Sequence, residues 1–299
     1  MQKRKLSCGD MQVEVRPDLG ASIERFVWRG IDIFRPVPAD SSVREMGYFP
    51  LTPYSNRIGH GHLPGQGQLR LNVLPQPHSL HGFGWERTWQ VVSHAPHALQ
   101  MSLTHASNED WPFDCEKRCE ITLDDAALQV RLTLRNTDAR SMPVGLGFHP
   151  FFPIDPATRL ITQVSGMWQT ENWLPVRHLA LSEQDLAFTT GQQGVVDWTV
   201  DNCFTGWNGS AMLDYANHCV TISADPACGF LQCFQPGDGR PFISLEPISH
   251  VPNAHQLAEQ GHTATGLRWL ASGESFSVGM RIAPTAKSAS TSWLQHSGF

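Results

Sequence analysis

The chain has 299 residues, of which 40% are hydrophobic and 17% charged, a composition that favours a folded protein over a disordered one. Its formal net charge of −6 argues against nucleic acid or an anionic membrane as the main partner, because both attract basic surfaces. No apolar run approaches the roughly 20 residues that span a bilayer, and residues 1–15 lack the apolar stretch of a signal peptide. We therefore expect a cytoplasmic protein, a monomer or a homodimer, that engages neither nucleic acid nor membrane.

Apolar and polar residues alternate with a period of two in several segments of the chain. The alternation is present in residues 11–15, again in residues 128–134, and near the C-terminus in residues 276–282. A period of two places one face of a strand on a core and the other face toward solvent. The pattern is typical of antiparallel sheet and predicts an all-β fold.

Turn-forming residues separate these segments throughout the chain, which contains 25 Gly and 21 Pro. We find no flexible linker, composition shift or internal repeat that would divide the chain, and all-β domains reach this length as one unit. We therefore predict one domain over residues 1–283. The polar stretch over residues 284–299 is expected to be a loosely ordered tail.

Fourteen histidines and seven cysteines raise the question of a metal site. The sequence contains no HExxH helix pair and no CxxC pair, so we predict no metal. It also lacks the GxSxG, GxxxxGK and GxGxxG patterns of serine hydrolases, P-loop enzymes and dinucleotide-binding proteins. The odd number of cysteines and the lack of an export signal favour reduced thiols.

The candidates for chemistry lie in short islands that combine charged or imidazole groups with Gly, Pro and aromatic residues. The islands are Phe49–Ile58 (FPLTPYSNRI), Ser79–Trp85 (SLHGFGW), Gly145–Phe152 (GLGFHPFF), Ile243–His250 (ISLEPISH) and, more weakly, Val200–Phe204 (VDNCF). In this order and spacing they resemble the aldose 1-epimerase (galactose mutarotase) family. The resemblance extends from residue 17 to residue 276, nearly the whole chain.

This resemblance implies a large antiparallel β-sandwich with a sugar in a cleft on one sheet. It implies that the substrate is a free aldose such as galactose or glucose and that no cofactor is required. Carried over position by position, it assigns His149 as general acid, Glu246 as general base, and Asn56, Arg57, His81 and Asp201 as substrate-binding residues.

Mutarotation suits such a pair, because one group must protonate the ring oxygen while the other removes the anomeric hydroxyl proton. His149 and Glu246 both lie in apolar stretches. Burial would lower the pKa of the histidine and raise that of the glutamate, whereas their mutual attraction would act in the opposite direction. The sequence leaves open which effect is larger.

Three alternatives remain at this stage. A hexose-6-phosphate epimerase would need extra cationic groups, for which Arg87 is a candidate. A sugar-binding protein without turnover is possible because a fold alone does not establish activity. A metal-dependent hydrolase would use the histidine-rich loops.

Overall fold

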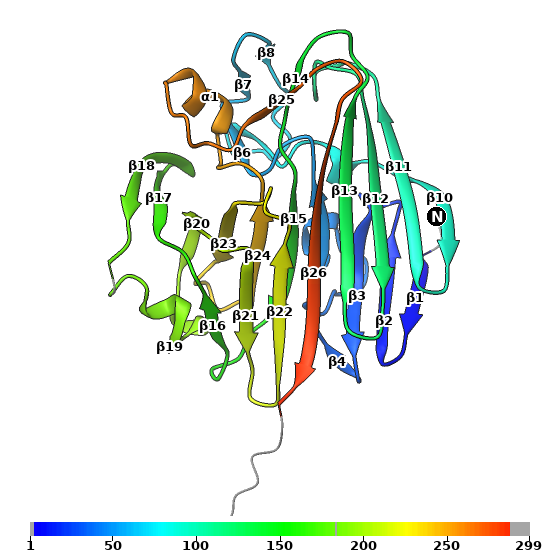
Figure 1. Cartoon of the computed structure of the whole chain (residues 1–299), viewed down its shortest axis with the longest axis vertical. Helices are drawn as coiled ribbons and strands as arrows, with labels where there is room; N and C mark the ends of the chain where they lie inside the picture. Colours follow the sequence, from blue (N-terminus) through cyan, green and yellow to red (C-terminus); the bar gives the residue numbers. More distant parts are fainter. Residues whose placement is uncertain (1–2, 183, 288–299) are drawn as a thin grey trace, which may run out of the picture.

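Two large antiparallel sheets packed face to face make up most of the protein (Figure 1). The structure is a computed structural model and describes residues 3–182 and 184–287. In spatial order, the first sheet contains β1 (Arg4–Cys8), β2 (Met11–Arg16), β3 (Ser22–Trp28), β5 (Tyr48–Leu51), β15 (Gly147–Pro153), β24 (Phe242–Ile248), β23 (Phe230–Gln235), β20 (Val200–Thr205), β17 (Gly166–Glu171) and β18 (Leu174–Ala180), with β4 (Ile31–Asp32) paired to β3.

The second sheet forms the other layer of the sandwich. In spatial order it contains β10 (Gln90–Ala95), β11 (Ala98–His105), β12 (Cys115–Leu123), β13 (Leu128–Asn136), β26 (Ser275–Ala286), β22 (His218–Ala224), β21 (Ser210–Asp214), β16 (Arg159–Thr162) and β19 (Thr190–Gly194). The predicted all-β, antiparallel sandwich is therefore confirmed.

Small elements gather at one end of the sandwich (Figure 1). They are the strand pairs β6 (Arg57–Gly59) with β9 (His78–Leu80), β7 (His62–Leu63) with β8 (Gly67–Gln68), and β14 (Met142–Val144) with β25 (Arg268–Leu270), together with helix α1 (Ala254–Glu259). Short 3₁₀ turns complete the structure: η1 (Val43–Glu45), η2 (Gly84–Glu86), η3 (Ala187–Thr189) and η4 (Val195–Asp197). Among the described residues, no helix is long and apolar enough to cross a membrane.

The alternating segments form strands, as predicted, and their apolar side chains fill the space between the sheets. Residues 11–15 lie in β2, 128–134 in β13 and 276–282 in β26. Along β13 the burial alternates residue by residue, with the leucines and valine inside and the polar residues outside. The period of two therefore places one face of each of these strands on the core.

The C-terminal boundary differs from the prediction. β26 continues to Ala286, and Pro284 lies opposite Val220 of β22. On its other side β26 pairs with β13 only as far as Ile282. A proline lacks the N–H that a strand with two neighbours needs, so it is tolerated where one of the neighbours has ended. The rest of the predicted tail, residues 288–299, lies outside the described residues.

The central strands β15 and β24 are buried on both faces. Phe152 and Leu245 point into the core between the sheets, whereas Phe151 and Phe242 belong to a second apolar cluster. Consecutive side chains of a strand point to opposite faces, so the second cluster covers the outer face of the first sheet. That outer face carries the candidate site.

Candidate active site

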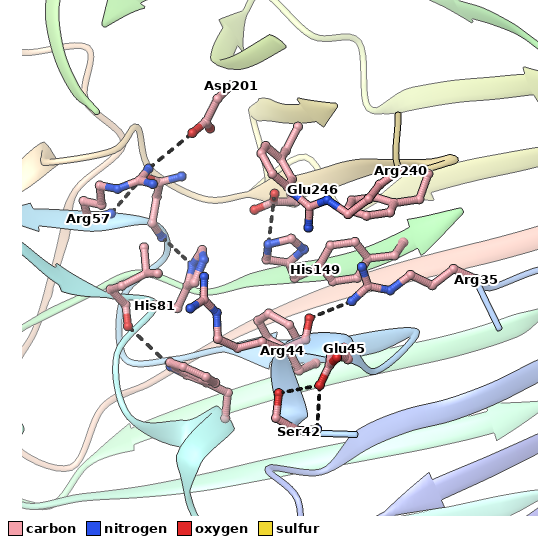
Figure 2. A pocket seen from close by; sticks show the side chains of 17 residues that line it. Arg35, Ser42, Arg44, Glu45, Arg57, His81, His149, Asp201, Arg240 and Glu246 are labelled. Atoms are coloured by element: carbon pink, nitrogen blue, oxygen red, sulfur yellow. Dashed lines mark hydrogen bonds and ion pairs between the residues drawn. The ribbon is translucent and has the colours of Figure 1, made fainter. Parts of the chain in front are cut away.

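A cavity of about 440 Å³ opens on the outer face of the first sheet (Figure 2). Its volume falls in the range of pockets that hold small molecules. All six residues that the resemblance singled out line this cavity: Asn56, Arg57, His81, His149, Asp201 and Glu246. The fold therefore brings together side chains from the β6–β9 hairpin and from strands β15, β20 and β24.

The register of two adjacent strands places His149 directly opposite Glu246. On either side of the pair, Gly147 lies opposite Ile248 and Phe151 opposite Ser244. Facing residues of antiparallel strands have their Cβ atoms within about 4.5–5.5 Å. The imidazole Nε2 of His149 lies 3.3 Å from Oε1 of Glu246, and both side chains are buried, with 7% and 2% exposed.

A hydrogen-bond chain through Ser244 sets the proton position on His149. The hydroxyl of Ser244 donates to the carbonyl oxygen of Pro150 at 2.7 Å and lies 2.9 Å from Nδ1 of His149. Since a carbonyl oxygen can only accept, the single hydroxyl proton is committed and Nδ1–H must donate to Ser244. Nε2 of His149 therefore faces Oε1 of Glu246, and the two atoms are placed to share one proton.

Burial dominates the electrostatics of this pair. Desolvation lowers the pKa of His149 well below 6.5, and the positive charges of Arg35 and Arg44 lower it further. Desolvation also raises the pKa of Glu246 well above 4.5, with a contribution from Asp201. Of the two opposing effects expected from the sequence, burial is thus the larger at both residues.

His81 presents a hydrogen-bond donor to the cavity. Its Nδ1 accepts a hydrogen bond from the backbone N–H of Asn56 at 3.1 Å, so the neutral ring carries its proton on Nε2. Burial lowers the pKa of His81 well below 6.5, which keeps the ring neutral. The ring centroids of His81 and His149 are 5.1 Å apart. Nε2–H of His81 is therefore available to a ligand beside His149.

The tight turn at His81 depends on the glycine that follows it. A Cβ on Gly82, whose φ is +66°, would lie 2.3 Å from the carbonyl oxygen of Thr52. Glycine is therefore required here because the backbone of Gly82 lies close to the backbone of Thr52.

Polar groups of Arg57 and Asp201 form the opposite wall, and Gln232 supports Asp201 from outside the cavity lining. Nη1 of Arg57 lies 3.6 Å from Oδ2 of Asp201, whose Oδ1 accepts a hydrogen bond from Nε2 of Gln232 at 2.8 Å. Among the described residues, Oε2 of Glu246 is buried and has no hydrogen-bond partner. A buried acceptor without a partner is costly, so this atom of the lining indicates where a ligand hydroxyl would donate.

Sequence reasoning missed several residues of this site. Ser244 lies two residues before Glu246 on β24 and so shares its face, a placement that follows once the strand is known. Gln232 lies opposite Glu246 on β23, and only the strand register shows this. The cavity lining also includes Arg35 and Arg44, from the connection between β4 and β5, and Arg240, from the loop before β24, none of which belongs to a local motif.

Arg87, the cation considered for a phosphosugar, does not line the cavity. Its guanidinium instead pairs with the carboxylate of Asp110. Within residues 3–182 and 184–287, no cluster of three or more His, Cys, Asp or Glu side chains has a geometry that could hold a metal ion.

Comparison with known proteins gives relatives of the same length and fold. A sequence model of the family described as aldose 1-epimerase matches residues 5–283. The chain is 34% identical over 290 residues to YphB, an uncharacterized protein of Escherichia coli K12, covering 93% of this chain and 97% of that protein.

Solved structures agree with this match. One from Escherichia coli K12, provisionally described as an aldose 1-epimerase, superposes with a TM-score of 0.86 at 30% identity, over 96% of this chain and 99% of that one. A galactose mutarotase-like protein from Clostridium acetobutylicum shares the fold, with a TM-score of 0.82 at 18% identity and 95% coverage of both chains. This chain belongs to the aldose 1-epimerase family.

Proposed function

We propose that the protein is a mutarotase, which interconverts the α and β anomers of an aldose by acid–base ring opening and reclosure. The observation that carries this proposal is the buried contact between Nε2 of His149 and Oε1 of Glu246, at 3.3 Å, in the wall of a cavity of sugar-binding size. A buried acid–base pair serves proton transfer, for which a site that only binds sugar has no need.

In the proposed reaction, the carboxylate of Glu246 removes the proton from the anomeric hydroxyl and a carbonyl forms between C1 and O1. The C1–O5 bond breaks as O5 takes the proton from Nε2 of His149. After rotation about C1–C2, His149 takes the proton back from O5, O5 attacks the other face of C1, and O1 recovers its proton from Glu246. The pair ends with the protons it began with, so the cycle needs no redox partner.

The remaining four predicted residues are proposed to hold the sugar. Nε2–H of His81 and the guanidinium of Arg57 supply donors, and Asp201 supplies an acceptor. Asn56 supports this arrangement, because its side-chain oxygen accepts from the backbone N–H of Arg57 at 2.9 Å and from Nη1 at 3.3 Å. Asn56 thereby orients Arg57, which points across the cavity to Asp201 (Figure 2).

Polarimetry on freshly dissolved α-D-galactose and α-D-glucose, with EDTA present, tests the proposal. A decay to the unchanged final rotation that is faster than the spontaneous decay, and proportional to enzyme concentration, supports a metal-independent mutarotase. A sugar that binds without any acceleration, over a panel of neutral and acidic aldoses, would instead indicate a binding protein.

A further inference from the structure

Three arginines line the cavity in addition to Arg57: Arg35, Arg44 and Arg240. The guanidinium of Arg44 lies next to His81, on the same side as Arg57 (Figure 2). Figure 2 shows Arg35 and Arg240 entering from the side opposite to Asp201 and Arg57. The neutral hydroxyls of a simple aldose do not require such a concentration of positive charge.

Arg35 is held in a fixed orientation on the side of the cavity opposite to Asp201. Its guanidinium lies 3.6 Å from the ring centroid of Phe151, and the ring of Phe151 stacks on the imidazole of His149 with 4.4 Å between centroids. Nε of Arg35 donates to the carbonyl oxygen of Met46 at 3.2 Å, and Nη2 donates to that of Arg44 at 2.6 Å. The ring of Phe151 therefore contacts both the guanidinium of Arg35 and the imidazole of His149, the proposed general acid.

Within the described residues, no carboxylate forms an ion pair with Arg35. Glu45 lines the cavity and attracts the guanidinium, but its Oε2 accepts hydrogen bonds from the backbone N–H and the hydroxyl of Ser42, at 2.8 and 3.0 Å. Burial and the nearby Arg240 lower the pKa of Arg35 to about 10, so it remains charged at neutral pH. A half-buried cation without an ion-pair partner is costly, and an anionic ligand would reduce that cost.

Arg240 is available to such a ligand. Its side chain is 56% exposed, and its ion-pair partner among the described residues is Asp238, which lies outside the cavity lining. An arginine presents a planar fork of N–H groups that matches the oxygens of a carboxylate or a phosphate.

We propose that the substrate is an aldose with an anionic group on C6, a carboxylate or a phosphate, which binds between Arg35 and Arg240. This inference rests on the proposed function. His149 acts on the ring oxygen O5, and C6 is attached to C5, the carbon next to O5. A substituent at C6 therefore reaches the half of the cavity that lies beyond His149 and Phe151.

The anion would also assist the chemistry. The positive charge of Arg35 adds to the effect of burial in lowering the pKa of His149. A negative group bound between Arg35 and Arg240 offsets that contribution and favours the protonated imidazole that must act as general acid. An anionic substrate thus favours the active protonation state of the site that it occupies.

The test is exchange NMR of the anomeric protons, which measures enzyme-driven α–β interconversion above the spontaneous rate. The panel pairs D-glucose with D-glucuronate and D-glucose 6-phosphate, and D-galactose with D-galacturonate. We expect kcat/KM for the matching anionic sugar to exceed that for its neutral partner by about 10-fold or more, the value of one charge-assisted hydrogen bond. Preference for the uronates or for the 6-phosphate identifies which anion the site takes.

A substitution at the exposed Arg240 tests the site with little effect on folding. In Arg240→Gln the ratio of kcat/KM for the anionic over the neutral sugar should fall about 10-fold. The matched control is Arg25→Gln, an arginine of similar exposure whose pairing partner is Asp32 and which does not line the cavity. It should keep the wild-type ratio.

A wild-type ratio near one, or a ratio that Arg240→Gln leaves unchanged, would overturn the inference while the mutarotase proposal stands. If no sugar is turned over, calorimetric titration with the same sugars measures binding instead. Tighter binding of D-glucuronate or D-glucose 6-phosphate than of D-glucose, lost in Arg240→Gln, would then support the anion site although the proposed function fails. Equal binding would contradict it.

Discussion

His149 and Glu246 face each other on adjacent antiparallel strands, with Nε2 of the imidazole 3.3 Å from Oε1 of the carboxylate. The cross-strand register, rather than a flexible loop, sets this separation. A proton-transfer pair on rigid strands needs little reorganisation when a substrate arrives.

Removing either member of the pair should abolish most turnover without unfolding the protein. Glu246→Gln and His149→Asn delete proton transfer and little volume, and we expect each to lower kcat by about 10²- to 10⁴-fold. Anomeric exchange NMR measures the rate, and circular dichroism verifies the fold. Glu116→Gln, at a half-buried position on β12 of the other sheet, is the matched control and should keep wild-type kcat. Wild-type rates in both folded site variants would show that the acid–base assignment is wrong.

Ser244 should act as a positioning residue for His149. Ser244→Ala leaves Nδ1–H of His149 and the carbonyl of Pro150 without their partner. We expect kcat to fall about 10-fold with little change in KM, and stability to fall by about 1–3 kcal/mol. The distinguishing measurement is the ¹⁵N chemical shifts of the His149 ring, which should report a shift away from the Nδ1–H tautomer. An unchanged tautomer would mean that Ser244 does not set the position of the proton on His149.

Asp201 should affect substrate binding and the pH profile together. In Asp201→Asn the side-chain oxygen can still accept from Gln232, but the charge facing Arg57 is lost. We expect KM to rise about 10-fold, as for a lost charge-assisted hydrogen bond. Asp201 also contributes to the raised pKa of Glu246, so its neutralisation lowers the pKa values of the pair. The bell-shaped profile of kcat/KM should therefore move to lower pH, and an unmoved profile would contradict the predicted coupling.

A buried histidine outside the cavity should make the protein sensitive to acid. His255 of α1 is buried beside Tyr54 and Trp111, neither ring nitrogen has a partner among the described residues, and burial lowers its pKa to about 3. Below pH 6.5 the unfolded chain binds a proton at this residue that the folded protein does not, so the free energy of unfolding falls as pH falls.

His255→Phe removes this proton uptake. The variant should match the wild type within about 1 kcal/mol at pH 7.5, because the rings are similar in size and both are neutral. At pH 4.5 we expect it to be more stable than the wild type by about 2 kcal/mol. Urea unfolding at the two pH values measures the free energy of unfolding of the variant and of the wild type. If the variant differs from the wild type by the same amount at both pH values, proton binding at His255 does not control the acid sensitivity.

The strand pattern was predictable because burial on one face leaves a period of two in the sequence, as along β13. β15 and β24 escape this rule. Both faces of β24 are buried, one by the core and one by the cavity cluster, so its sequence FISLEPI does not alternate. The family resemblance drew attention to these two segments but did not assign them as strands. The end of β26 was missed because Pro284 reads locally as a strand terminator.

The candidate site was predictable where a residue belongs to a motif with a recognisable spacing. His149 and Glu246 are of this kind, and the structure places them side by side. Ser244 and Gln232 depend on which residues share a face and on the cross-strand register, which a single sequence does not specify. Arg35 and Arg240 meet at the cavity through the paths of two loops far apart in the sequence, so no local pattern predicts their position.

The most direct test of the central claim is anomeric exchange NMR on wild type and Glu246→Gln side by side, over the panel of neutral and C6-anionic aldoses with EDTA present. The account predicts α–β exchange above the spontaneous rate for at least one aldose in the wild type, and its loss by about 10²-fold or more in the folded variant. Spontaneous rates with every aldose, or equal acceleration by both proteins, would contradict it.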